Sequence, residues 1–491
     1  MISGSLLAKL RDSSLATDKA LLAGRWLDRS ESGKTFDVSN PATGEVIATL
    51  PDFGRVEAGR AISAAYAAQK GWAKKTGKER AAVLRNLYDL MVANADDLAA
   101  VLTMEMGKPL AEAKGEILYG AAYVEWFAEE AKRVYGDTIP GHQPDKRIIV
   151  VKQPVGVVAA ITPWNFPNAM LARKFAPAIA AGCSLVSKPA SETPLSALAL
   201  AVLAERAGLP SGLFSVISST DAPTIGKEFT ENDKVRKLTF TGSTAVGKIL
   251  MRQAADQVQK VSLELGGNAP FIVFDDSDLD AAVEGAMISK FRNNGQTCVC
   301  ANRLYVQAGA YDQFAKKLAE KVVAMRVGDG FEHSVNAGPL ISRDALAKVE
   351  EHVADAIAKG AQAKVGGKPH ARGGLFFEPT VLTHVTSDMK IAREETFGPV
   401  APLFKFDSEE DVVEMANATE FGLASYFYAR DISKIFRVAE ALEYGMVGIN
   451  TGLISTEVAP FGGVKQSGQG REGSKYGIDD YVEIKYLCLS V

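Results

Sequence analysis

The stretch Val157-Val158-Ala159-Ala160-Ile161 is a short apolar run that fits a buried β-strand. It opens a series in which apolar runs alternate with helical segments, beginning with a helix over 169–181 and a strand over 183–187. Strands that are apolar throughout are typical of a parallel sheet covered by helices on both faces. The pattern therefore predicts an α/β fold. A second alternating series, from Ala269 to about Ile449, predicts a further α/β unit.

The regions outside these two series also have a clear periodicity. Helices are predicted over 61–72, 78–93 and 96–106, and the last ends at the stop signal Gly107-Lys108-Pro109. The β-rich run 147–158 and the C-terminal run 481–487 read as strands. A strand at a chain terminus has a free edge, so we expect the C-terminal run to seek a partner strand.

Composition limits the possible functions. A chain of 491 residues is too long for one core, and its net charge of −4 argues against nucleic acid as a partner. No apolar stretch approaches ~20 residues, so no membrane span is expected. The four cysteines lack metal-ligand spacing, and the N-terminus lacks a signal-peptide core. We expect a cytoplasmic protein without a metal centre.

Two polar segments suggest covalent chemistry. Cys298 lies in the glycine-bearing turn 291–300, and Glu264 lies in the segment 263–268, between apolar residues and two glycines. A thiol nucleophile and a partly desolvated carboxylate suit covalent catalysis followed by base-assisted hydrolysis. Alone, each has a plainer interpretation, because a buried cysteine is usually an inert small hydrophobe and most glutamates are solvated.

Six segments together resemble the aldehyde dehydrogenase superfamily and occur in its order. They are Ile161–Pro167, Phe240–Gly247, Leu263–Asn268, Phe291–Cys300, Glu394–Pro399 and Pro460–Gly468. The resemblance implies a Rossmann-type cofactor domain, an α/β catalytic domain and a β oligomerisation hairpin. The implied boundaries are 10–140 with 160–268 for the cofactor domain, 269–457 for the catalytic domain, and 141–159 with 475–491 for the oligomerisation segment. A homo-oligomer, dimer or tetramer, is implied as well, with the terminal strand pairing across subunits.

The same resemblance implies roles for three residues. Cys298 attacks the aldehyde, the Asn165 side chain and the Cys298 backbone N–H stabilise the oxyanion, and Glu264 activates the water that hydrolyses the thioester. Leu263 and Leu265 flank Glu264, so we expect its pKa to be raised, as a general base requires. The intact set speaks against a non-catalytic member of the fold. Retention of Glu264 also disfavours a relative that transfers the acyl group to CoA.

The resemblance further implies a nicotinamide dinucleotide. Its contacts are Trp164, Asn165, Lys188, Pro189, Ala190, Ser191, Gly242, Ser243, Gly247, Leu265, Glu395 and Phe397. Many NAD-preferring members have a carboxylate where this sequence has Ser191, and that carboxylate would repel a 2′-phosphate. We therefore expect NADP to be accepted and preferred, with NAD possible because Glu192 is adjacent.

Two arginines indicate the substrate. Arginine grips carboxylates through paired hydrogen bonds, and Arg173, Arg292 and Ser455 match positions that bind the distal carboxylate in succinate-semialdehyde dehydrogenases. The expected reaction converts succinate semialdehyde to succinate at the end of 4-aminobutyrate breakdown. Glutarate semialdehyde or another ω-carboxy aldehyde stays an alternative. Cys300 is either a packed thiol or the partner of Cys298 in a reversible disulfide.

Overall fold

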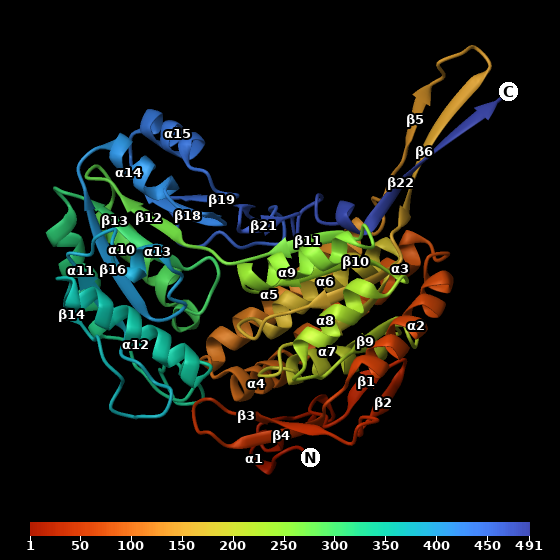
Figure 1. Ribbon diagram of the computed structural model, residues 1–491, viewed down its shortest axis with the longest axis horizontal. Coiled ribbons are helices and arrows are strands. Elements are labelled where there is room, and N and C mark those ends of the chain that lie inside the picture. Colours follow the sequence, from red (N-terminus) through yellow and green to blue (C-terminus); the bar gives the residue numbers. More distant parts are fainter.

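The computed structural model describes residues 1–491 and contains two large sheets and a projecting arm (Figure 1). The first sheet is six-stranded, with the order β21-β11-β10-β7-β8-β9. Its strands are β7 Val157–Ile161, β8 Ser184–Lys188, β9 Phe214–Val216, β10 Val235–Thr241, β11 Lys260–Glu264 and β21 Gly468–Gln469. All are parallel except β21, which pairs antiparallel with β11. The expected parallel sheet is confirmed.

Helices cover both faces of this sheet. One face carries α6 and α7, with α3, α4 and α5 outside them, and the other carries α2, α8 and α9. Their bounds are α2 Arg55–Trp72, α3 Gly77–Ala93, α4 Ala95–Met106, α5 Leu110–Glu130, α6 Pro167–Ala181, α7 Leu195–Arg206, α8 Ala222–Glu231 and α9 Thr244–Ala255. Helix α4 ends at Gly107, whose φ of 87° is left-handed, so the predicted stop signal is confirmed. Every residue of α6 is buried, because α5 lies over the side that faces away from the sheet.

The second sheet is seven-stranded, with the order β14-β15-β16-β13-β12-β18-β19. Its strands are β12 Ala269–Val273, β13 Ala301–Gln307, β14 Gln362–Val365, β15 Thr380–Thr383, β16 Val400–Phe406, β18 Ala424–Tyr428 and β19 Met446–Ile449. Successive residues of β12 alternate between two cores: Phe271 and Val273 face one core, and Ile272 faces the other. The helices are α10 Leu279–Phe291, α11 Tyr311–Val323, α12 Arg343–Ala358, α13 Lys390–Arg393, α14 Glu409–Asn417 and α15 Ile432–Ala441.

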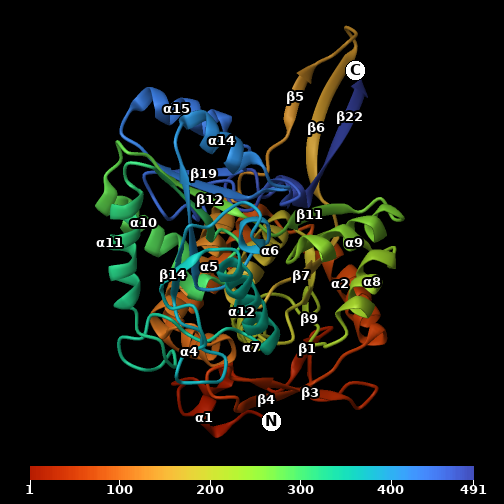
Figure 2. The same cartoon turned by 60° about the vertical axis from the view of Figure 1, so that its left-hand side comes forward.

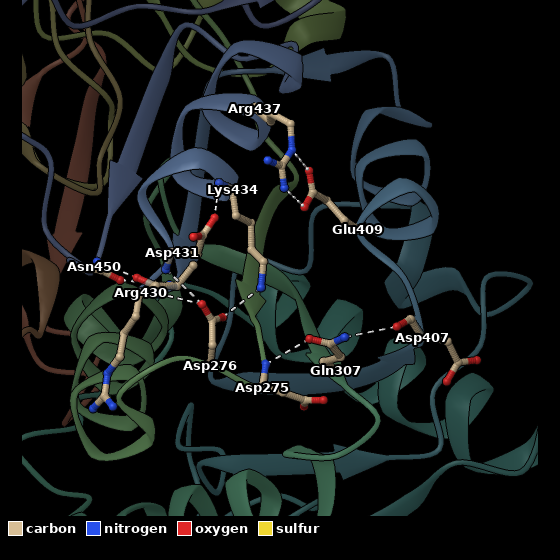
Figure 3. A network of polar contacts seen from close by, with 11 residues as sticks. Asp275, Asp276, Gln307, Asp407, Glu409, Arg430, Asp431, Lys434, Arg437 and Asn450 are labelled. Carbon is tan, nitrogen blue, oxygen red and sulfur yellow. Dashed lines mark hydrogen bonds and ion pairs between the residues drawn. The ribbon is translucent and has the colours of Figure 1, made fainter.

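Polar contacts close the carboxyl edge of this sheet (Figure 3). Asp276, just beyond β12, accepts hydrogen bonds from the backbone N–H groups of Arg430 and Asp431 and from Lys434 Nζ, each at 3.0 Å. Arg437 joins α15 to Glu409 of α14 through two hydrogen bonds of 2.9 and 2.8 Å. These polar groups are hydrogen-bonded to one another at the carboxyl edge, where ligands commonly bind in α/β sheets. Glu264 and Cys298 instead precede β12 and β13, at the opposite edge of this sheet.

The arm is a three-stranded antiparallel sheet of β22 Val482–Ser490, β6 Lys146–Pro154 and β5 Asp137–Pro140. It extends away from both large sheets, as the turned view also shows (Figure 2). The arm differs at both ends from the segment 141–159 that the sequence predicted. Its first strand, β5, begins earlier, at Asp137, and β7, which starts at Val157, belongs to the six-stranded sheet. The C-terminal strand finds a partner in its own chain, pairing with β6 from Val482↔Pro154 to Ser490↔Lys146.

The remaining elements are short. They are α1 Gly4–Leu7, β1 Ala20–Leu22, β2 Arg25–Leu27, β3 Thr35–Ser39, β4 Val46–Pro51, β17 Phe421–Gly422 and β20 Val464–Lys465. No helix of the structure combines the length and apolar character needed to cross a membrane.

Candidate active site

The candidate nucleophile lies in a tight turn between α10 and β13. Asn293, Asn294 and Gly295 take left-handed backbone conformations in succession, with φ of 51°, 55° and 75°. Asparagine tolerates this region better than other residues with a side chain, and a Cβ atom on Gly295 would lie 2.1 Å from the Gly398 carbonyl oxygen. The turn reverses the chain and leaves Cys298 half-buried at the amino end of β13.

The thiol of Cys298 is protonated in this environment at neutral pH. Burial raises its pKa to about 12, and the charge of Glu395 adds to this effect while Arg173 opposes it. The thiolate is the nucleophilic form of cysteine. Attack by Cys298 therefore requires a base or a change in local charge.

Glu264 ends β11, and two glycines follow it closely. A Cβ atom on Gly267 would lie 2.6 Å from the Cys298 carbonyl oxygen, so the glycine allows the two segments to approach each other. The carboxylate of Glu264 is buried, and its Oε2 has no hydrogen-bond partner. Burial raises its pKa well above the ordinary value, and the charge of Glu472 acts in the same direction. An unpartnered carboxylate with a raised pKa suits a base that activates water.

A buried charge cluster behind Glu264 was missed in the sequence. Glu472 accepts a hydrogen bond from Lys174 Nζ at 2.5 Å and forms an ion pair with the Arg173 guanidinium at 2.7 Å. All three side chains are almost fully buried. Burial pushes the pKa of Glu472 upward, but Lys174 and Arg173 outweigh it and the pKa lies below its ordinary value. The cluster thus places one carboxylate and two cations near Glu264: Glu472 raises the pKa of Glu264, and Arg173 and Lys174 oppose that effect. The only sequence signal was the unusual pair of adjacent cations in an otherwise apolar helix.

Asn165 lies between the end of β7 and α6, and it is fixed at two atoms. Its side-chain Nδ2 donates a hydrogen bond to the Gln296 backbone carbonyl oxygen at 3.0 Å. The backbone carbonyl oxygen of Asn165 accepts hydrogen bonds from Lys108 Nζ at 2.7 Å and from Asn293 Nδ2 at 3.1 Å. An amide nitrogen has two N–H donors. One holds the Cys298 loop through Gln296, which leaves the other for a ligand.

The residues predicted to bind the dinucleotide come together from distant segments. Trp164 and Phe397 form an edge-to-face aromatic pair with centroids 5.5 Å apart, and Glu395 accepts a hydrogen bond from the Gly267 N–H at 3.3 Å. A Cβ atom on Gly247 would lie 2.4 Å from Leu265. The structure brings together the members of each of these pairs.

A second group of cofactor candidates lies along the carboxyl edge of the six-stranded sheet. Ser243 caps the N-terminus of α9 directly after Gly242, and its hydroxyl accepts from the Val246 N–H at 3.4 Å. Lys188 is buried at the end of β8, ahead of Pro189, Ala190 and Ser191, and Ser191 Oγ donates to Glu192 Oε2 at 3.1 Å. Burial lowers the pKa of Lys188, and Glu192 is the foremost charge that opposes this.

The two arginines proposed to bind substrate differ in their surroundings. Arg173 is already paired with Glu472 and lies over the Phe461 ring at 3.9 Å, so it is not the free cation that the sequence suggested. Arg292 forms no ion pair, is half-buried, and lines a small cavity together with Ser455, Thr297 and Tyr426. The structure therefore brings Arg292 and Ser455 together and gives Arg173 a different partner.

Cys298 and Cys300 are both free thiols. Cys300 is buried, and its thiol donates to the Lys290 carbonyl oxygen at 3.4 Å. A disulfide between Cys298 and Cys300 stays a prediction.

Comparison with known proteins identifies the family. The aldehyde dehydrogenase family profile matches residues 26–487. The glutarate-semialdehyde dehydrogenase of Pseudomonas aeruginosa is 64% identical, over 98% of this chain and 99% of that protein. The NADP-dependent succinate-semialdehyde dehydrogenase of Escherichia coli is 62% identical, over 98% and 100%. The 3-sulfolactaldehyde dehydrogenase of Pseudomonas putida is 63% identical, over 98% and 99%.

A solved structure agrees with these relatives. The crystal structure of succinate-semialdehyde dehydrogenase from Burkholderia pseudomallei has a TM-score of 0.97 and 64% identity, and the match covers 98% of this chain and all of that one. The predicted resemblance and fold class are thereby confirmed. The chain belongs to the aldehyde dehydrogenase family.

Proposed function

We propose that the protein oxidises succinate semialdehyde to succinate with reduction of NADP. The observation that carries this proposal is Arg292, a half-buried guanidinium without an ion-pair partner, at a cavity that Ser455 also lines. A partly desolvated guanidinium without an ion-pair partner is suited to bind a carboxylate through paired hydrogen bonds, so a substrate carboxylate is a fitting counter-charge. The proposal also has support from relatives, since the aldehydes in their names all carry a distal acid group.

Glutarate semialdehyde is the second candidate. The Pseudomonas aeruginosa relative named for it is 64% identical to this chain, slightly more than the 62% of the Escherichia coli relative named for succinate semialdehyde. The two substrates differ by one methylene, which usually changes transition-state binding by only ~1–3 kcal/mol. We expect both to be oxidised, with succinate semialdehyde preferred.

Unpartnered polar groups make the carboxyl edge of the six-stranded sheet a fitting site for NADP. The hydroxyls of Thr162, Ser187 and Thr241 are buried without hydrogen-bond partners at the ends of β7, β8 and β10. Bound groups commonly supply such partners at this edge of an α/β sheet. The N-terminus of α9 after Gly242 suits a pyrophosphate. Lys188 beside the uncharged Ser191 suits a ribose 2′-phosphate.

In the proposed mechanism, Cys298 first releases its thiol proton to solvent, and Sγ then attacks the aldehyde carbon as the thiolate. The thiohemiacetal oxyanion accepts hydrogen bonds from Asn165 Nδ2 and the Cys298 N–H. The chemistry that NADP supplies when bound is acceptance of the hydride, after which Cys298 carries a thioester. Glu264 takes a proton from water, which then attacks the thioester carbonyl. The succinate product leaves, and the thiol is restored.

The arm is the part of the chain that we propose to mediate assembly into a homo-oligomer. Ile484 and Tyr486 of β22 are 71% and 58% exposed, and the strand has no partner at its outer edge. An exposed strand with apolar side chains favours association with another chain.

The test of the proposed activity is NADPH formation from succinate semialdehyde by the purified wild-type chain, followed by absorbance. The Cys298→Ala variant is the control, and it should bind NADP but form no NADPH. A wild-type chain without turnover, or a Cys298→Ala variant with turnover, would overturn the proposal. Dependence on added CoA would show acyl transfer in place of hydrolysis.

A further inference from the structure

Lys108 lies directly behind the proposed oxyanion donor. It follows α4 in the segment Gly107-Lys108-Pro109, and only 2% of the residue is exposed. Its Nζ donates to the Asn165 carbonyl oxygen at 2.7 Å and to Glu116 Oε2 at 2.6 Å, and it lies 3.8 Å from the centroid of the Phe166 ring. A buried lysine with so many directed contacts to one turn fixes the position of that turn.

Glu116 extends the same contacts to the start of α6. Its Oε1 accepts the backbone N–H groups of Asn168 and Ala169 at 3.0 and 3.2 Å, where a carboxylate also complements the helix dipole. The Lys108–Glu116 pair therefore holds Asn165 itself and the first turn of α6 that follows it. One turn earlier on α5, Glu112 accepts the Asn293 N–H at 2.7 Å, so the nucleophile loop is anchored to the same helix.

We infer that Lys108, paired with Glu116, is a positioning residue that aims the Asn165 amide at the oxyanion formed on Cys298. This inference rests on the proposed function. Lys108 acts through Asn165 and does not touch the substrate. Its loss should slow reactions that pass through an oxyanion and spare reactions of Cys298 that do not.

Two reagents separate these cases on the same thiol. Acylation by p-nitrophenyl acetate forms the Sγ–C bond at a carbonyl carbon, passes through an oxyanion and expels p-nitrophenolate. Alkylation by iodoacetamide forms the Sγ–C bond at a saturated carbon, expels iodide and needs no oxyanion donor. In Lys108→Met we expect acylation to slow by about 10- to 100-fold, because removing an oxyanion donor outright costs about 10²–10³-fold. Alkylation should stay within about twofold.

Three further variants complete the test. Lys108→Met with Glu116→Gln leaves no unpaired buried charge and should show the same selective loss. In an Asn165→Ala background, Lys108→Met should have no additional effect on acylation. Lys237→Met, which removes another fully buried lysine of the cofactor domain, should change neither rate.

The outcomes distinguish the inference from the proposed function. Wild-type protein that p-nitrophenyl acetate does not acylate at Cys298 would overturn the proposed nucleophile and with it this inference. Equal losses of acylation and alkylation in both Lys108 variants would overturn only the positioning role. So would an effect of Lys108→Met that persists undiminished in the Asn165→Ala background.

Discussion

Replacing Arg292 by methionine should remove the preference for acidic aldehydes. The substitution keeps an unbranched side chain in the cavity and deletes the charge. A hydrogen bond to a charged group contributes ~1.5–3 kcal/mol net. Because Arg292 is half-buried and has no ion-pair partner, we take about 2 kcal/mol for its contact with the substrate carboxylate. Since each 1.4 kcal/mol is tenfold, kcat/KM for succinate semialdehyde should fall about 30-fold.

Butanal provides the internal reference, because it lacks the carboxylate. Its kcat/KM should change by less than about twofold in Arg292→Met, and the midpoint of thermal unfolding should be unchanged. Arg292→Lys should give an intermediate loss of kcat/KM for succinate semialdehyde, since lysine keeps the charge but cannot form the paired hydrogen bonds of a planar guanidinium. Equal losses for both aldehydes in Arg292→Met would refute the assignment.

Arg173→Met is the matched comparison. Arg173 is paired with buried Glu472, which keeps Lys174 as a partner in the variant, so the loss of Arg173 should destabilise the fold by ~1.5–3 kcal/mol and lower kcat/KM for both aldehydes alike. The measurements are the unfolding free energy in denaturant and the ratio of kcat/KM for the two aldehydes. A changed ratio with unchanged stability would show that Arg173 binds the substrate after all.

Three other predictions concern the chemistry. Glu264→Gln should release a burst of about one NADPH per site and then turn over slowly, because the thioester lacks its base; a steady rate near that of wild type would refute the assigned role. Ser191→Glu should lower kcat/KM for NADP and spare NAD, and equal losses would show that the position does not face the 2′-phosphate. Alkylation of Cys298 without cofactor should accelerate about tenfold per pH unit from pH 7 to 9, because the thiolate fraction grows with pH below a pKa of about 12. A plateau in this range would contradict the raised pKa of the thiol.

The sequence predicted the elements whose signal is local. The apolar run at 157–161 became β7, the stop at Gly107 ended α4, and the second alternating series became the seven-stranded sheet. The C-terminal strand was predicted as well, with a partner in another subunit, and that pairing stays a prediction. Its pairing with β6 of the same chain was not predicted, since it joins segments from opposite halves of the sequence.

The site was predictable where a motif carried it and not where distant charges set it. Cys298, Glu264 and Asn165 lie in motifs, whereas Glu472 meets Arg173 and Lys174 only after the chain folds. Cations on a helix usually face solvent, and nothing local shows that α5 covers this face of α6. Lys108 appeared only as part of a helix stop, yet its side chain reaches Asn165.

The central claim is that the site selects an aldehyde by its distal acid group. The most direct measurement is kcat/KM of the wild-type chain for succinate semialdehyde and for butanal, with NADP as cofactor. We predict that kcat/KM for succinate semialdehyde exceeds that for butanal by about 30-fold or more, the ratio that the Arg292 contact contributes. Equal values for the two aldehydes would contradict it.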